Sequence, residues 1–598
     1  MDGGWLPLRW ATRAGLAALC AIAIAIVFAL TMDLDVPART PAGSAVGAAR
    51  DDDGAAPRRA PAPVDLTAPV AVARPGGAGG MDLVEDAHTV VFAADHDDRA
   101  VAAALVALDL RAPLVLVPTQ ALSSAAPSDP AGAQASEPVA EPSAAADAAR
   151  EAGRRGLVRA VVIGDGVDDV ARDSGADHIL RLPADPPGDA DAGTVIAAAA
   201  AGGAGAEQGG DADGSGEDGA GEDGAGVSGV TAVDLARYRL PAPAASGAAV
   251  LVRPDATDAL ATVVSARAVG HAVVPTGAED LRADPGTGAR LAELGDGATP
   301  NLVLAGAAYA DSDPDAVARQ AAVAARGIEL PGGGQLVIDP GNPRRRRYVG
   351  LYGVPHSPAL GALGEQPVAR SVTRAKDLAR TYQKAVGDRV EIIPCFEIIA
   401  TVASASAGKD RDFSNELPVA DLRRAVDAAG AAGVYVLLDL QPGRTDFTTQ
   451  AKRYEALLRE PHVGLALDPE WRLGPRERHL RQIGSVGIDE VNEVAGWLAD
   501  LVARERLPQK MLLLHQFRLS MLPDRGRLDT SRDELAYVIQ MDGQGPQGSK
   551  LDTWRAITAD PPDGVQFGWK NFYDEDTPLR SPAATMGLEP RPVFVSYQ

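Results

Sequence analysis

The sequence predicts an α/β protein that ends in a (β/α)8 barrel, also called a TIM barrel. The main observation is a regular alternation of apolar, strand-like segments with helical segments over residues 345–598, as eight parallel strands with crossover helices require. A looser alternation over 85–338 predicts a separate parallel layer of Rossmann-like or flavodoxin-like type. An uncharged apolar run at 14–32 precedes both regions and is long enough to be a transmembrane helix.

The composition limits the classes of function. A chain of 598 residues exceeds the size of one core, so several domains are expected. The net charge of -24 argues against nucleic acid as a partner, because nucleic-acid binding requires a basic surface. Only two cysteines occur, Cys20 and Cys395, which excludes a disulfide framework and a cysteine zinc site. No cofactor is expected from any motif.

The amino-terminal segment predicts export. Arg9 and Arg13 precede the apolar run, so residues 1–13 should remain in the cytoplasm and the bulk of the chain should lie outside it. The run 14–32 is expected to be a transmembrane signal anchor in the cell membrane; if it is instead a cleaved signal, the protein is secreted. Residues 33–84 are rich in Ala, Pro, Asp and Gly and predict a disordered linker.

The region 85–338 contains two similar successions of strands and helices. Its expected strands fall at 89–95, 112–118, 157–164, 249–253, 271–275 and 301–306. Their order suggests two diverged copies of one unit. Low-complexity stretches at about 119–147 and 201–229 should be disordered insertions.

The first of these copies resembles the type 2 cell-wall-binding repeat of exported bacterial surface proteins. The similarity is carried by Thr89-Val-Val-Phe-Ala-Ala-Asp, Ala102 to Leu108, Ala112-Pro-Leu-Val-Leu-Val and Ala160-Val-Val-Ile-Gly-Asp. The resemblance implies that this region binds a cell-wall polysaccharide. A non-binding α/β spacer is the alternative.

Eight strand-like segments define the expected barrel. They fall at 348–355, 390–402, 434–440, 463–468, 510–517, 535–541, 565–570 and 592–597, and the clearest intervening helices at 368–386, 419–429, 448–459, 489–504 and 551–557. Because a barrel enzyme places its chemistry at the carboxyl ends of the strands, polar residues at those ends are the candidate site.

The fourth strand shows this arrangement most clearly. Its alternation places Asp468 and Glu470 on the same face as Gly464 and Ala466, while the apolar residues occupy the other face. Pro469 cannot donate a ladder hydrogen bond, so strand pairing should end there. The two carboxylates are therefore expected at the rim of the barrel.

Polar or aromatic residues occur at the ends of the other strands too. Together with Asp468 and Glu470, the candidate catalytic residues are Asp439 and Asp542, and the candidate substrate-binding residues are Tyr352, His356, Glu397, Gln441, Trp471, His515, Gln544, Trp569 and Lys570. Trp471 and Trp569 lie beside charged strand ends, where an indole can stack on a sugar ring. Several acids at equivalent strand ends indicate one shared site.

Glycoside hydrolysis is the leading interpretation. It needs a protonated carboxyl as general acid and a second group as nucleophile or base. The neighbouring Asp468 and Trp471 should raise the pKa of Glu470, which makes Glu470 the acid and Asp439 or Asp542 its partner. The Asp-x-Glu at 468–470 and Met541-Asp542 resemble the chitinase-type family 18 pattern, in which the Glu is the acid and the substrate's acetamido group is the nucleophile. Gly464 and Ala466 replace the upstream aspartates of that pattern, so only the acid role is carried over.

Two other functions remain open. A metal-dependent phosphodiesterase would use Glu397, Asp439, Asp468 and either His515 or His356 as ligands. A barrel that binds a glycan without cleaving it is the other, because the seventh strand bears no carboxylate. In either glycan reading the partner is a cell-wall or extracellular polysaccharide.

The barrel region also resembles a group of exported actinobacterial proteins. The similar stretches are Tyr352-Gly-Val-Pro-His, Leu438-Asp-Leu-Gln-Pro-Gly-Arg, Leu467-Asp-Pro-Glu-Trp-Arg, Leu514-His-Gln-Phe-Arg and Met541-Asp-Gly-Gln-Gly. This resemblance implies export and a barrel fold, and it implies no particular reaction.

Overall fold

The computed structural model describes residues 62–63, 70–72, 81–117, 150–182, 192–201, 240–295, 300–339 and 345–598, apart from a few positions within these ranges. The predicted cytoplasmic segment, the transmembrane run, the 119–147 insertion and most of the 201–229 insertion lie outside the described residues. No helix in the described ranges combines the length and apolarity needed to cross a bilayer.

The first α/β sheet contains four parallel strands. These are β4 (Thr89–Ala94), β5 (Leu114–Val117), β6 (Arg159–Ile163) and β7 (His178–Leu182), in the order β5-β4-β6-β7. Helices α2 (Asp97–Leu110) and α5 (Asp168–Asp173) pack on it, whereas α6 (Ala192–Ala201) packs against the second sheet, described next. Strand β1 (Ala62–Pro63) pairs with β3 (Val84–Asp86) in a separate two-stranded sheet. The order 2-1-3-4 is that of the first strands of a flavodoxin-like sheet.

The second sheet repeats this order. Strands β8 (Ala248–Val252), β9 (Ala272–Pro275) and β10 (Asn301–Ala305) again have the order 2-1-3, and they are accompanied by α8 (Leu260–Ala268), α9 (Pro285–Gly295) and α10 (Pro314–Ala324). The fourth place is taken by β2 (Val70–Val72), parallel to β10. These three residues, within the predicted linker over 33–84, thus form the edge of a sheet, while most of that linker lies outside the described residues.

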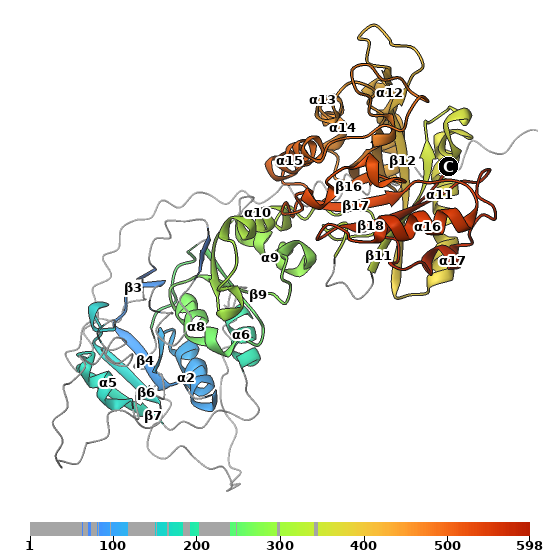
Figure 1. The fold of residues 1–598 in the computed structure, drawn as a ribbon. Coiled ribbons are helices and arrows are strands. Elements are labelled where there is room, and N and C mark those ends of the chain that lie inside the picture. Colours follow the sequence, from blue (N-terminus) through green and yellow to red (C-terminus); the bar gives the residue numbers. More distant parts are fainter. Residues whose placement is uncertain are drawn as a thin grey trace, which may run out of the picture. The chain divides into compact units, whose positions relative to one another are not determined.

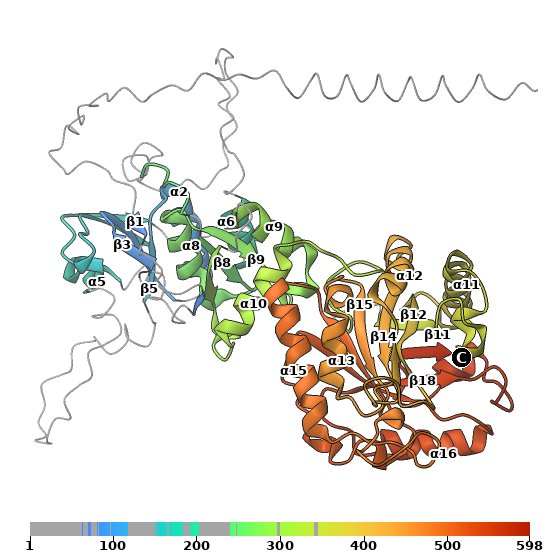
Figure 2. The same ribbon diagram turned by 90° about the horizontal axis from the view of Figure 1, so that it is seen from above.

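The carboxyl-terminal region is a closed parallel barrel (Figures 1 and 2). Its eight strands are β11 (Arg345–Gly353), β12 (Val390–Ala403), β14 (Tyr435–Leu440), β15 (Val463–Leu467), β16 (Lys510–His515), β17 (Leu535–Met541), β18 (Gln566–Asn571) and β19 (Phe594–Tyr597). They follow one another around the barrel in chain order, and β11 pairs with both β12 and β19. The short β13 (Ser414–Glu416) pairs antiparallel with the end of β12. The predicted eight-stranded barrel is confirmed.

Helices cover the outside of this barrel. They are α11 (Val368–Val386), α12 (Val419–Ala431), α13 (Phe447–Arg453), α14 (Glu455–Leu458), α15 (Ile488–Glu505), α16 (Gln547–Thr558) and α17 (Pro582–Met586). The helix expected over 448–459 is divided at Tyr454 into α13 and α14. The connection from β16 to β17 contains only two 3₁₀ turns, at 519–521 and 525–527.

Strand alternation separates two apolar layers in the barrel. On β15, Leu465 and Leu467 face outward and pack with the helices, whereas Ala466 belongs to an interior cluster that includes Tyr435 and Met511. Leu330 and Val337, which precede β11, complete this interior cluster. The amino-terminal half of the barrel interior is thus filled with apolar side chains. Polar side chains occupy only the carboxyl-terminal half, where the strand ends form the mouth.

Candidate active site at the barrel mouth

Seven polar side chains from seven strands meet in the upper part of the barrel. They occupy inward-facing positions, one from each of β11, β12, β14, β15, β16, β17 and β18: Tyr352, Glu397, Asp439, Asp468, His515, Asp542 and Lys570. Glu397 lies in the middle of β12, and the other six lie within one residue of a strand end. Each is at most 8% exposed. The structure therefore brings together most of the predicted site, and strand alternation, which has a period of two, is the reason.

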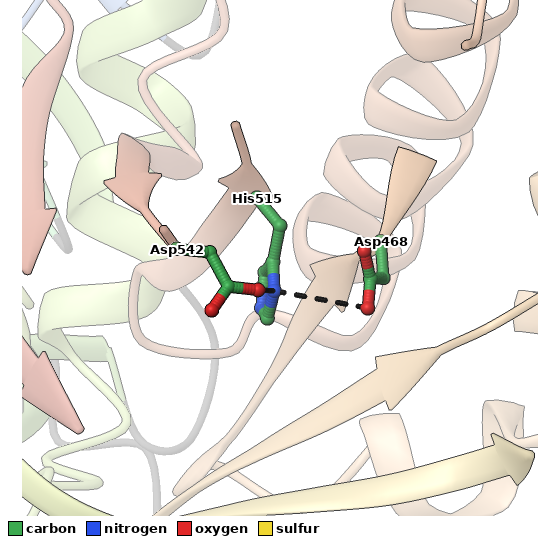
Figure 3. A group of neighbouring side chains, drawn as sticks. All are labelled: Asp468, His515 and Asp542. Carbon is green, nitrogen blue, oxygen red and sulfur yellow. Dashed lines mark hydrogen bonds and ion pairs between the residues drawn. The ribbon is translucent and has the colours of Figure 1, made fainter. Parts of the chain in front are cut away.

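His515 lies at the centre of this cluster. Its Nδ1 is 2.6 Å from Asp542 Oδ2 and 3.9 Å from Asp468 Oδ2. Its Nε2 is 2.8 Å from Glu397 Oε1 and 4.0 Å from Asp439 Oδ1. Figure 3 shows the imidazole between Asp468 and Asp542. Four carboxylates from four strands thus surround one histidine.

A second group of contacts joins the remaining members to this centre. The Tyr352 hydroxyl donates to Asp439 Oδ2 at 3.0 Å and accepts a hydrogen bond from Gln441 Nε2 at 3.1 Å. Lys570 Nζ lies 3.1 Å from Asp542 Oδ1 and 3.3 Å from the centroid of the Tyr352 ring. Gln441 is fixed in turn because its Oε1 accepts from the Ala403 amide.

Burial and the charges of neighbouring groups have opposite effects on the pKa values of His515 and Asp542. Burial opposes the protonation of His515, but the surrounding carboxylates, Asp542 first, raise its pKa well above the usual value. Burial also favours the protonated form of Asp542, but Lys570 and then His515 outweigh it and lower the pKa of that carboxyl. Asp542 is therefore the acid that these two cations hold ionised.

The pKa values of three other carboxyls at the mouth are raised. Burial, reinforced by Glu397, raises the pKa of Asp439 to about 6. Burial, reinforced by Asp542, raises the pKa of Glu470 to about 7. Burial and the charge of Glu470 raise the pKa of Asp468 well above its usual range. The mouth thus combines one aspartate whose pKa is lowered with carboxyls whose pKa values are raised, which is the separation that acid and base roles require.

Besides Asp542 Oδ1, which pairs with Lys570, three carboxylate oxygens in this cluster are buried without a hydrogen-bond donor. They are Glu397 Oε2, Asp439 Oδ1 and Asp468 Oδ1. Burying an unpaired carboxylate oxygen costs free energy, so such groups call for a proton or a ligand. The residues that carry these oxygens come from, or directly follow, three adjacent strands, β12, β14 and β15.

Glu470 lies just outside the buried cluster. It belongs to the 3₁₀ turn Pro469–Trp471 that follows β15, and it is partly exposed. Asp542, Lys570, His515 and Asp439 are all close enough to affect its pKa. Glu470 thus lies at the rim, near enough to the buried acids for their charges to act on it.

Four predicted site residues are not part of this cluster. His356 and Gln544 are exposed, and His356 lines a separate cavity of about 300 Å³ with Asp421 and Arg424. Trp471 is partly buried and packs edge-on against His479, with 5.2 Å between ring centroids.

The fourth, Trp569, cannot stack on a sugar in this structure, because its ring is fully buried on the outer face of β18. It packs against Trp554 at 5.6 Å and donates from Nε1 to Asn571 Oδ1. Alternation explains this outcome, since Lys570 takes the inward position and its neighbour must face out.

Sequence reasoning missed one polar pair inside the barrel. Gln540 on β17 donates through Nε2 to the hydroxyl of Ser596 on β19, at 2.8 Å, and both residues are fully buried. Strand alternation could have indicated this pair, since Gln540 lies on the same face of β17 as Asp542. The pair lies at the inward positions next to the cluster and links two strands that are not neighbours in the sheet.

The fold and these contacts define a parallel eight-stranded α/β barrel with a buried acid and histidine cluster at its mouth. No known protein family matches the chain, and no curated protein matches it either. The resemblances to a cell-wall-binding repeat and to a chitinase-type hydrolase therefore remain predictions.

Proposed function

We propose that the barrel hydrolyses a cell-wall or extracellular carbohydrate, with Glu470 as the general acid. The observation that carries this proposal is the gradient of exposure at the mouth: Glu470 is partly exposed, while Asp439, Asp468 and Asp542 lie buried behind it. A substrate at the mouth meets the Glu470 carboxyl first, so Glu470 is the group placed to protonate a leaving oxygen.

The partner carboxylate in this proposal is Asp542. Its position between His515 at 2.6 Å and Lys570 at 3.1 Å supports an ionised carboxylate facing the acid. Glycosidases use such a pair of carboxyl groups, one protonated and one ionised. Asp439 is the other partner that the sequence suggests. It is the weaker candidate because one of its oxygens already accepts a hydrogen bond from the Tyr352 hydroxyl.

The location is part of the same proposal. The apolar run 14–32 would tether the chain in the cell membrane, with the barrel outside, and the region 85–338 would hold it at the wall polysaccharide. Protease treatment of intact cells should then digest the barrel. Protection of the barrel until the cells are lysed would contradict this location.

The test of the activity uses the full chain and its Glu470→Gln variant on purified cell-wall glycan, with release of reducing ends as the readout. Loss of the proton donor should lower turnover by about 10²–10⁴-fold, while the circular dichroism spectrum stays unchanged. Glu493→Gln is the matched control, since Glu493 is exposed on α15. Full activity of the Glu470 variant would exclude this assignment, and glycan retention without any product would favour the non-catalytic binding protein.

The metal-dependent phosphodiesterase is supported by one specific observation. Asp468, His515 and Asp542 place ligand atoms within 4.8 Å of one another. A chelator distinguishes this function, since it should abolish phosphodiester cleavage and added metal should restore it.

A further inference from the structure

Three mouth residues from consecutive strands have the arrangement of metal ligands. Asp468 follows β15, His515 ends β16 and Asp542 follows β17, and their side chains point toward one another (Figure 3). His515 Nδ1 is 2.6 Å from Asp542 Oδ2 and 3.9 Å from Asp468 Oδ2. Adjacent ligands of an ion bound at about 2.1 Å are separated by roughly 3 Å. The observed separations bracket this value.

An independent observation is that one oxygen of the Asp468 carboxylate, Oδ1, has no hydrogen bond. The Asp468 side chain is 1% exposed, its Oδ1 is buried without a donor, and its closest cation is the distant His515 nitrogen. Asp542 differs because Lys570 and His515 both contact it. A buried carboxylate is retained when it is protonated, paired or bound to a cation. Asp468 Oδ2 is the oxygen that faces His515, so a cation beside His515 Nδ1 would pair with this carboxylate.

The other nitrogen of His515 is held as in metal sites. Its Nε2 lies 2.8 Å from Glu397 Oε1, and both residues are fully buried. A bound ion would displace the Nδ1 proton, while Nε2 would keep its proton and donate it to Glu397, so that Nδ1 would present its lone pair to the ion. Metal-binding histidines are commonly oriented by a carboxylate in this way. Glu397 is thus a positioning residue for the ligand.

The charges of the cluster favour a divalent ion. Four buried carboxylates, Glu397, Asp439, Asp468 and Asp542, face only two basic side chains, His515 and Lys570. A dication beside Nδ1 would compensate the carboxylates that form when these acids give up the protons that burial favours. One imidazole with two carboxylates suits first-row transition ions, because Mg²⁺ and Ca²⁺ prefer oxygen ligands throughout.

From these observations we propose that Asp468, His515 and Asp542 bind one divalent transition-metal ion, such as Zn²⁺ or Mn²⁺, with Glu397 orienting the histidine. The ion would lie beside Glu470, so it would polarise a substrate oxygen or activate a water where Glu470 can transfer a proton. The proposal concerns the same mouth as the proposed function, but it is tested by binding, so the two can fail separately.

A second acidic group provides the matched control. Asp410, Asp412 and Glu416 also lie within ligand distance of one another. Their oxygens are already engaged, since Asp412 accepts from Ser414 and Thr445 and Glu416 pairs with Arg453. Asp410→Asn therefore changes one exposed acid of equal charge outside the group of Asp468, His515 and Asp542.

The experiment measures the binding of Zn²⁺ and of Mn²⁺ to the chelator-treated full chain by calorimetry. We expect one equivalent to bind to the wild type and to Asp410→Asn, and the affinity to fall at least 100-fold in Asp468→Asn. Glu397→Gln should weaken binding about 10- to 100-fold, as the loss of an orienting partner does. Absence of stoichiometric binding in the wild type, or equal affinity in Asp468→Asn, would overturn the proposal.

A spectroscopic readout covers the case in which Asp468→Asn fails to fold. X-ray absorption of the Zn²⁺-loaded wild type should show one imidazole nitrogen and otherwise oxygen ligands. A shell with no imidazole, or with two or more, would also overturn the assignment. Release of reducing ends is measured separately, so an active enzyme without a metal contradicts only this inference, and a metal-binding protein without activity contradicts only the proposed hydrolysis.

Discussion

Lys570 lies over the ring of Tyr352, with Nζ 3.3 Å from the ring centroid. The two residues come from β18 and β11, which are separated in the sheet by β19. The ring face attracts the ammonium group, while Lys570 also pairs with Asp542 and the Tyr352 hydroxyl with Asp439. This contact therefore connects Asp542 with Asp439 across the mouth. Substitution of Lys570 or Tyr352 should lower the free energy of unfolding.

Tyr352→Phe should destabilise the barrel by about 1–3 kcal/mol, because it removes the donor to the buried Asp439 and leaves Gln441 Nε2 without its acceptor. Tyr537→Phe is the matched control, since the buried Tyr537 hydroxyl has no hydrogen-bond partner and its removal should cost almost nothing. Urea unfolding followed by tryptophan fluorescence measures both, because four of the six tryptophans lie in the barrel. Equal effects of the two substitutions would contradict the role of the Tyr352 hydroxyl.

Lys570→Met should be more damaging than Tyr352→Phe. Removing one member of a buried ion pair leaves Asp542 short of its partner, and such losses cost about 3–5 kcal/mol. Lys452→Met, on the exposed face of α13, should change the free energy of unfolding by less than about 0.5 kcal/mol. A Lys570→Met protein with the unfolding midpoint of the wild type would show that Asp542 needs no cation.

The buried Lys510 should make the free energy of unfolding depend on pH, independently of the residues at the mouth. Its Nζ is buried at the opposite end of the barrel and donates to the carbonyls of Glu460 and Val463. Burial lowers its pKa from 10.5 to about 7. Between about pH 7 and 10.5 the unfolded chain binds one more proton than the folded barrel, so the free energy of unfolding should rise with pH.

The measurement is urea unfolding at several pH values. The wild type should gain up to about 1.4 kcal/mol per pH unit from Lys510 between pH 7.5 and 9.5, and Lys510→Met should lack this slope. A slope of the same size in the variant would assign the effect to another group.

Gly464 should tolerate no side chain. A Cβ at this position would lie 2.6 Å from the Met511 carbonyl oxygen and 2.8 Å from the Tyr435 hydroxyl. Gly464→Ala should therefore destabilise the barrel by about 1–3 kcal/mol through overpacking of its interior. Gly496 on α15 has nothing within 4 Å of an added Cβ, so Gly496→Ala should instead stabilise by about 0.5–1 kcal/mol through helix propensity. Thermal unfolding of the two variants should shift in opposite directions.

The period of two in the strands made much of the site predictable from the sequence. Alternation placed Asp439, Asp468 and Asp542 inward at strand ends, and barrel topology required those ends to lie together. The same rule, applied to β18, would have placed Trp569 on the outside once Lys570 was placed within. Residues beyond the strands, such as His356 and Gln544, have no such periodicity, and their exposure could not be predicted from pattern.

The sequence by itself determined the apolar alternation, and with it the closed parallel barrel and the inward direction of the acids, because side-chain direction along a strand is a local property of the backbone. Only the tertiary structure decided that His515 takes the centre, with Glu397 at one nitrogen and Asp542 at the other. These contacts join residues up to 118 positions apart. Such distances depend on the register and stagger of all eight strands together, which no single segment specifies.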